Sequence, residues 1–187
     1  MESKTVKFSQ TTITELMIPS FANFSGKVHG GILLSLMDKV AYVCASKHSG
    51  AYCVTVSVDG VEFREPVEVG ELVSFAASVN YVGNSSMIIG IRVTSLQPKT
   101  GKEKHTNSCY FTMVAKNDDG TLKTVPQLIL ESEQDVRRFY EAKMLKKHRK
   151  QIRLVLSAEE KPDHETILTL LKEDRCSYMV SVDGEKN

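Results

Sequence analysis

A long apolar segment, followed at once by alternating segments, restricts the possible folds of this sequence more than any other feature. Beyond Gly31, as far as about Lys47, neither glycine nor proline interrupts, and helix formers such as Leu33, Leu34 and Leu36 predominate. Apolar residues occupy nearly the whole circumference, which predicts a buried helix rather than a surface helix. A helix of this kind needs a sheet wrapped around it, so the sequence predicts an α+β architecture.

The residues that would form this sheet follow the helix directly. They alternate with period two, are rich in β-branched residues and are separated by short connections. The four segments are 52–63, 71–82, 86–96 and 103–116. We expect them to form an antiparallel meander, with an additional edge strand at 5–16.

The helical pattern returns after Pro126. Ser132 is a suitable N-cap, and an apolar stripe with acids in the first turn and bases in the last extends over 131–153. A polar tail with one short helical pattern at 165–173 follows. We therefore expect a main domain at 1–156 and an extension at 157–187, which packs on the outer face of the main domain or on a neighbouring subunit and supplies no catalytic group.

One acid, Asp38, interrupts the apolar helix. It lies seven residues beyond Gly31, which is two turns and about 10 Å along the axis, so both residues share a face. A buried charge is costly unless it is paired or used. Lys39 is a poor partner because adjacent residues diverge on a helix. A salt bridge to a strand and a place at a subunit interface are structural alternatives, and a general base is the functional one.

Two glycines, Gly30 and Gly31, precede this helix after His29. A plain loop before a helix is one interpretation. The other begins from the unpaired N–H groups of a helix start, which carry partial positive charge. Glycine lets a substrate approach that backbone closely, so a carbonyl oxygen that gains negative charge would be stabilised there.

Composition and missing motifs exclude several classes. The formal net charge is +1, which does not suggest nucleic acid or an anionic membrane as a partner. The four cysteines form no C-x-x-C pair, so a zinc site and a disulfide framework are not expected. No secretory signal and no apolar run long enough to span a bilayer is evident, which makes a cytoplasmic location the expectation. G-x-S-x-G, the P-loop and the dinucleotide G-x-G-x-x-G do not occur.

The stretch "NFSGKVHGGILLSLMDKVAYVCA" at 23–45 resembles the N-x-x-G-x-x-H-G-G-x-x-x-x-x-x-D signature of the hotdog-fold acyl-CoA thioesterases. Further blocks, among them "VSVDGVEFREPVEVGELV" and "YFTMVAKNDDG", resemble successive parts of the acyl-CoA hydrolase branch. The resemblance covers roughly residues 8–150. It implies a hotdog fold, in which an antiparallel sheet wraps around one long central helix, and hydrolysis of acyl-CoA to a fatty acid and CoA without a cofactor or metal.

The same resemblance implies a shared active site. Asp38 of one subunit would work with Asn23 of its neighbour, as a general base or as a nucleophile. Asn23 would orient the water or the carbonyl, and the N–H groups of Gly30 and Gly31 would polarise the thioester. His29 would support the loop. A dimer is then the minimum assembly, and the resemblance favours a hexamer.

Coenzyme A carries phosphates, so cationic or backbone N–H contacts should exist. The resemblance implies such contacts at the turn formed by Asn84, Ser85 and Ser86. Arg64, Lys116 and the bases at 146–150 are further candidates, although a solvated helix end explains that basic run as well. Two rival functions are a hotdog acyl dehydratase and an acyl-CoA-binding regulator without catalysis.

Overall fold

The computed structural model describes residues 2–157 and 163–173. Contacts divide the chain into two units, residues 1–147 and residues 148–187. The elements in chain order are β1 (Ser3–Thr5), α1 (Val6–Ser9), β2 (Thr11–Leu16), the 3-10 helix η1 (Pro19–Phe21), α2 (Gly30–Ser49), β3 (Tyr52–Asp59), β4 (Leu72–Val82), β5 (Ser86–Gln97), β6 (Lys102–Lys116), β7 (Gln127–Ile129), α3 (Glu133–Ser157) and α4 (His164–Glu173). The first unit thus contains both sheets and the central helix.

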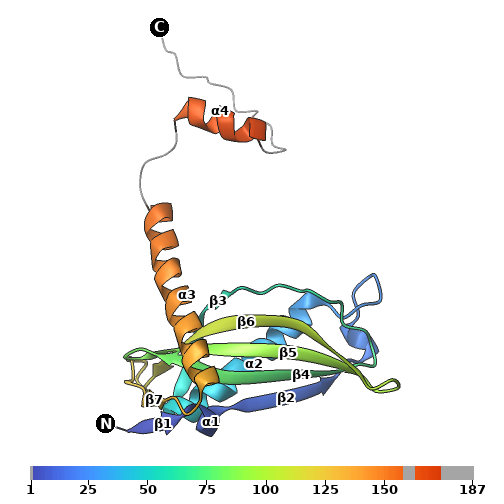
Figure 1. Ribbon diagram of the computed structural model, residues 1–187, viewed down its shortest axis with the longest axis horizontal. Coiled ribbons are helices and arrows are strands. Elements are labelled where there is room, and N and C mark those ends of the chain that lie inside the picture. The colour runs from blue at the N-terminus through green and yellow to red at the C-terminus, as the bar shows by residue number, and fades with distance from the viewer. Residues whose placement is uncertain (1, 158–162, 174–187) are drawn as a thin grey trace. The chain divides into compact units, whose positions relative to one another are not determined.

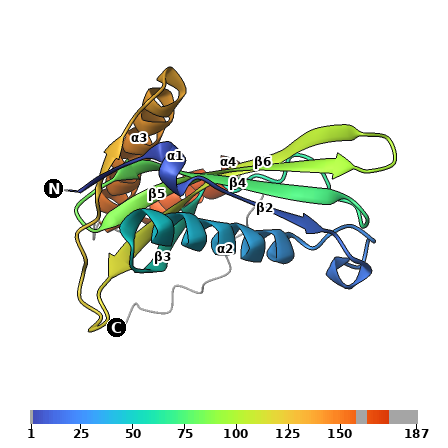
Figure 2. The same ribbon diagram turned by 90° about the horizontal axis from the view of Figure 1, so that it is seen from below.

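Helix α2 forms where the sequence predicts a helix, and its two ends have recognisable caps. The His29 side chain accepts a hydrogen bond from the Gly31 N–H, and Gly50 takes the left-handed conformation, with φ of 60°, that ends the helix. The helix lies along one face of the five-stranded sheet (Figure 1, Figure 2). The supporting role expected for His29 is therefore confirmed.

Only one side of α2 is buried in the protomer. Met37, Val40 and Ala41 are fully buried against the sheet, whereas Leu34 and Tyr42 are exposed by 36% and 40%. The expectation of a helix buried all round is wrong for the single chain. Its exposed apolar stripe needs a further surface to cover it.

The five-stranded sheet has the order β2-β4-β5-β6-β3, and every neighbouring pair is antiparallel. Strands β4, β5 and β6 form the expected meander. β3 does not pair with β4, the next strand in the chain. The connection of residues 60–71 crosses from one side of the meander to the other. β3 therefore pairs with β6 and becomes an edge strand, which the sequence analysis did not predict.

The expected edge strand at 5–16 is interrupted. Thr5 caps the short helix α1 by accepting a hydrogen bond from the Phe8 N–H, so the chain forms β1, α1 and then β2. β1 pairs with β7 in parallel as a separate two-stranded sheet. The local cap outweighs the β-branched composition of this segment.

The helix predicted after Pro126 is present as α3. Ser132 Oγ accepts a hydrogen bond from the Asp135 N–H at 3.1 Å, which confirms Ser132 as the N-cap. The Phe139 ring stacks on Tyr81 of β4 with 5.7 Å between centroids.

In the second unit, α4 matches the short helical pattern of the tail. The rest of the tail lies outside the described residues, and both its docking and the domain boundary after 156 stay predictions.

No helix in the described part of the chain combines the length and the apolar character needed to cross a membrane.

Glu71, just before β4, is a buried carboxylate, and both of its oxygens have partners in the chain. It accepts hydrogen bonds from Ser95 Oγ at 2.5 Å and the Glu68 N–H at 3.0 Å, and it pairs with Lys104 Nζ at 3.2 Å. Burial alone raises the pKa of Glu71, but these hydrogen bonds and the lysine outweigh it and hold the pKa below its usual value. The carboxylate thus holds the connection of residues 66–71 against β5 and β6.

Glu71→Ala is expected to lower the free energy of unfolding by about 3 kcal/mol, because it leaves buried donors and Lys104 without their partner. Since the folded pKa is depressed, the stability that ionised Glu71 contributes is present above its unfolded pKa of about 4.3 and is lost as the pH falls through the folded value. Urea unfolding at pH 7 and at lower pH tests this. A loss below about 0.5 kcal/mol at pH 7 would contradict the structural role.

Candidate active site

The acid of α2 is accessible in the protomer and has one defined partner. Thr55 Oγ1 of β3 donates a hydrogen bond of 2.6 Å to Asp38 Oδ1. Oδ2 of Asp38 has no hydrogen-bond partner among the described residues. The carboxylate is therefore held through one oxygen, and its other oxygen is available to a water molecule or a substrate.

A β-bulge in β3 explains how Thr55 reaches this position. Thr55 is paired with Met113 of β6, and Ser57 is paired with the adjacent residue, Thr112. Two residues along β3 thus correspond to one along β6. Val56 is the extra residue, and a bulge of this kind redirects the neighbouring side chains. The Thr55 hydroxyl contacts both Asp38 and Met113 Sδ, the latter at 3.2 Å. Thr55 is a site residue that the sequence analysis missed.

Exposed apolar side chains lie on the same two elements as Asp38 and Thr55. Tyr42 of α2 and Tyr52 of β3 lie with their ring centroids 6.1 Å apart. The other exposed apolar side chains on these two elements are Leu34, Val43, Val56 and Val58. Because β3 also has an unpaired edge, this surface suits a second copy of the chain.

The start of α2 provides only part of the expected carbonyl site in this conformation. The Gly31 N–H already donates to His29 Nδ1 at 2.9 Å. The Gly30 N–H has no such partner among the described residues. A Cβ on Gly30 would lie 3.3 Å from the Phe63 ring, so this glycine permits close packing beside the helix start.

Asn23 lies in the loop before α2 and organises its own turn. Its Oδ1 accepts hydrogen bonds from the Ser25 N–H at 2.9 Å, the Ser25 hydroxyl at 2.7 Å and the Lys27 N–H at 3.1 Å. Its amide NH2 group donates to no described residue. Within one chain no hydrogen bond joins Asn23 to Asp38, which lies about 12 Å along the helix axis beyond Gly30.

The expected CoA-binding turn connects β4 and β5. Carbonyl oxygens of Asn84 and Ser85 accept hydrogen bonds from the Val125 and Ala115 N–H groups, both at 2.9 Å, which fix the turn. Lys146, from the basic run at 146–150, donates to the Tyr81 hydroxyl at 3.3 Å. Its Nζ lies 3.6 Å from the position of a Cβ on Gly83, so a cation does border this turn.

The other two basic candidates lie far from each other. Arg64 donates its backbone N–H to the Thr106 carbonyl at 3.0 Å, and its guanidinium is paired with Glu62 at 3.3 Å. Lys116 ends β6 opposite Tyr52. Ten residues of strand, roughly 33 Å, separate the two positions along β6. One protomer therefore brings Lys116 near the β4–β5 turn, where the Ala115 N–H donates to Ser85, but not Arg64.

The three thiols in the described part of the chain do not take part in this arrangement. Cys44, Cys53 and Cys109 are free and buried. Burial raises the pKa of Cys44 and of Cys109 to about 12, so neither supplies a thiolate at neutral pH. In the described part of the chain, no group of three or more histidine, cysteine or acidic side chains is arranged to hold a metal ion.

Comparisons with known proteins agree with the fold of this chain. Residues 25–102 match the thioesterase superfamily. The protein VdlD of Helicobacter pylori is 49% identical over 124 residues, which are 66% of this chain and 71% of VdlD. An apo-hexameric acyl-CoA thioesterase has a structure with a TM-score of 0.79 and 32% identity, covering 86% of this chain and all of that chain.

A third relative has also been solved with single residues replaced by alanine. The acyl-CoA hydrolase of Staphylococcus aureus, solved with butyryl coenzyme A and coenzyme A, is 28% identical with a TM-score of 0.77, covering 90% of this chain and 98% of that one. Three more structures of that enzyme carry alanine in place of one asparagine, one aspartate and one threonine. Their separations in sequence equal those among Asn23, Asp38 and Thr55.

Proposed function

Because this chain belongs to the acyl-CoA thioesterase family of the thioesterase superfamily, we propose that Asp38 is the carboxylate with which it hydrolyses acyl-CoA to a free carboxylic acid and CoA. The observation that carries the proposal is the pair of Asp38 and Thr55, an exposed carboxylate that is fixed by one hydrogen bond of 2.6 Å and shares its helix and the facing strand with exposed apolar side chains.

The proposed reaction begins at the unpaired oxygen of Asp38. Asp38 accepts a proton from water while the water oxygen forms a bond to the thioester carbonyl carbon. The resulting tetrahedral anion expels the CoA thiolate, which takes up a proton to leave as the thiol. Direct attack by Asp38, followed by hydrolysis of the mixed anhydride, remains the alternative route to the same products. Neither route assigns a step to a metal or cofactor.

The proposed carbonyl site lies at the start of α2. The Gly30 N–H, which has no partner among the described residues, would donate to the carbonyl oxygen as it becomes negative, helped by the helix dipole. The Gly31 N–H would donate to the same carbonyl oxygen only after its hydrogen bond to His29 Nδ1 is broken. The amide NH2 group of Asn23 is a second donor, because the turn of residues 23–27 uses only its oxygen.

We further propose that Asn23 and Asp38 meet across a subunit interface. The free edge of β3 and the exposed apolar residues of α2 and β3 support a homodimer that joins two sheets edge to edge. The hexameric relatives support a larger assembly, a hexamer built from three such dimers. In this arrangement the β4–β5 turn and Lys146 are the candidates for the phosphates of CoA.

We place the protein in the cytoplasm, in the turnover of fatty acyl thioesters. Three buried free thiols fit a reducing compartment.

A thiol-release assay with acyl-CoA substrates of increasing chain length tests the proposed function. The full chain is expected to release one thiol for each acid formed and to show a preference for some chain lengths. Tight binding of acyl-CoA without thiol release at any length would favour a binding regulator instead.

Thr55→Ala is expected to reduce turnover about tenfold, because Asp38 loses the hydrogen bond that fixes its orientation. KM should change little, since the hydroxyl already has its partner in Asp38. Steady-state kinetics of Thr55→Ala and Thr55→Ser measure both parameters, and the serine variant should recover most of the turnover. Equal activity of the alanine variant and the wild type would remove Thr55 from this positioning role.

A further inference from the structure

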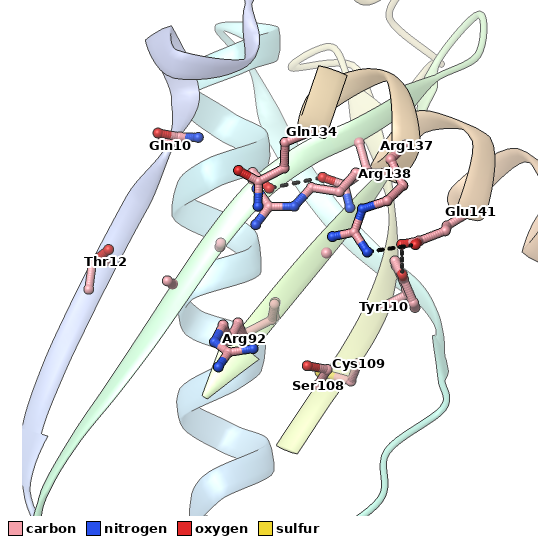
Figure 3. Close-up of a pocket in the computed structure, with 16 residues that line it drawn as sticks. Gln10, Thr12, Arg92, Ser108, Cys109, Tyr110, Gln134, Arg137, Arg138 and Glu141 are labelled. Atoms are coloured by element: carbon pink, nitrogen blue, oxygen red, sulfur yellow. Dashed lines mark hydrogen bonds and ion pairs between the residues drawn. The ribbon is translucent and has the colours of Figure 1, made fainter. Parts of the chain in front are cut away.

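A polar hollow lies on the face of the sheet that is turned away from α2. Its volume is about 530 Å³. We call it the arginine hollow, because Arg92 of β5 and Arg137 and Arg138 of α3 line it (Figure 3). It lies entirely within the first unit and does not include Asp38.

Strand register builds the floor of the arginine hollow from small residues around one arginine. Arg92 is paired with Ala76 of β4 on one side and with Ser108 of β6 on the other. In the next row, Gly90 lies between Ser78 and Tyr110. Four of these five neighbours, Ala76, Ser108, Gly90 and Ser78, have small side chains or none, so the Arg92 guanidinium stands in an open space rather than in a packed surface.

A buried amide closes one end of the floor. The β4 register shifts between Val79 and Tyr81, which makes Asn80 a bulge residue. Asn80 is only 4% exposed, and its Oδ1 accepts from the Ser78 hydroxyl at 2.9 Å. A Cβ on Gly90 would lie 2.2 Å from Asn80 Nδ2, so only glycine leaves room for this amide.

One face of α3 forms the wall. Its lining residues follow the helical spacing i, i+3, i+4 and i+7 and are Gln134, Arg137, Arg138 and Glu141. Glu141 Oε1 pairs with Arg137 at 3.4 Å, and Glu141 Oε2 accepts from the Tyr110 hydroxyl at 3.2 Å. Tyr110 remains a neutral donor there, because burial and the Glu141 charge raise its pKa.

The charges of the arginine hollow do not balance. Three arginines face one carboxylate, and that carboxylate is engaged by Arg137 and Tyr110. Arg92 and Arg138 have no ion-pair partner among the described residues. Two guanidinium groups that share a polar hollow repel each other and therefore favour an anion between them.

We propose that the arginine hollow binds a phosphorylated small molecule, with Arg92 and Arg138 on the phosphate oxygens. Planar guanidinium groups recognise phosphate in a bidentate manner. The volume is that of a small-molecule site rather than of a single ion. The phosphate belongs either to CoA, which rests on the proposed function, or to a different phosphorylated compound that binds independently.

Isothermal titration of the full chain with inorganic pyrophosphate tests the proposal without an activity readout. One pyrophosphate is expected per chain, with an affinity that falls as salt is added. Arg92→Ala and Arg138→Ala should each weaken binding by about tenfold or more, and Arg92→Glu should abolish it. Arg153→Ala is the matched control, since this exposed arginine lies on the same helix outside the hollow.

Absence of pyrophosphate binding to the full chain would overturn the proposal. So would equal affinities of Arg92→Ala, Arg138→Ala and Arg153→Ala, measured on variants whose thermal unfolding matches the wild type. Repeating the titration with saturating CoA identifies the source of the phosphate. Competition indicates that the hollow holds a phosphate of CoA, and unchanged affinity indicates a separate ligand. Because binding is measured directly, failure here leaves the thioesterase proposal intact.

Discussion

Asp38→Ala is expected to lower the turnover of acyl-CoA by about two orders of magnitude or more, the usual scale for the loss of a general base. The fold should survive, because the Asp38 side chain is exposed and its hydrogen bond to Thr55 is the one contact of the carboxylate in the described residues. CoA binding should largely survive as well, since the proposed phosphate contacts lie at the β4–β5 turn. Initial rates of thiol release, together with CoA titration, measure both properties.

Asp118→Ala is the matched control for this experiment. Asp118 is an exposed carboxylate in the turn after β6 and has no proposed role. Its variant should keep the activity of the wild type. A folded Asp38→Ala protein with near-normal turnover would remove Asp38 from the catalytic role.

Mixing two inactive variants, Asn23→Ala and Asp38→Ala, should restore activity after subunit exchange. If the two groups meet across an interface, each mixed dimer has one site with both residues intact. A random equal mixture should then recover about one quarter of the wild-type activity, because half of the dimers are mixed and one of their two sites is complete.

Asn23→Asp is a more selective partner in this mixture. It keeps an oxygen that accepts from Ser25 and Lys27, so the turn is retained, but it replaces the NH2 donor. The same recovery is expected with this variant. Continued inactivity after exchange has been demonstrated by mass spectrometry would show that both groups come from one chain or that Asn23 is misassigned.

The central helix and its acid could be predicted from the sequence because the signals are local. Apolar helix formers, the glycines at the start and a single carboxylate all fall within about twenty residues. The same applies to the Ser132 cap of α3 and to the β4–β5–β6 meander, whose turns are short. In each case neighbouring residues determine the structure.

The position of β3 and the role of Thr55 could not be predicted in this way. The connection after β3 is long, so the sequence does not say which edge the strand will join. The bulge at Val56 depends on the pairing with β6, and the bond from Thr55 to Asp38 depends on how helix and strand pack. The exposed stripe of α2 could not be predicted either, because an apolar composition does not show whether a helix buries all its sides within its own chain.

The central claim is that this protein hydrolyses acyl-CoA, and turnover in isotopically labelled water tests it most directly. During repeated turnover with an acyl-CoA substrate, the product acid should carry labelled oxygen in an amount equal to the thiol released. Asp38→Ala should abolish both signals together. Thiol release without a labelled acid, or no thiol release from any acyl-CoA by the folded oligomer, would contradict the account.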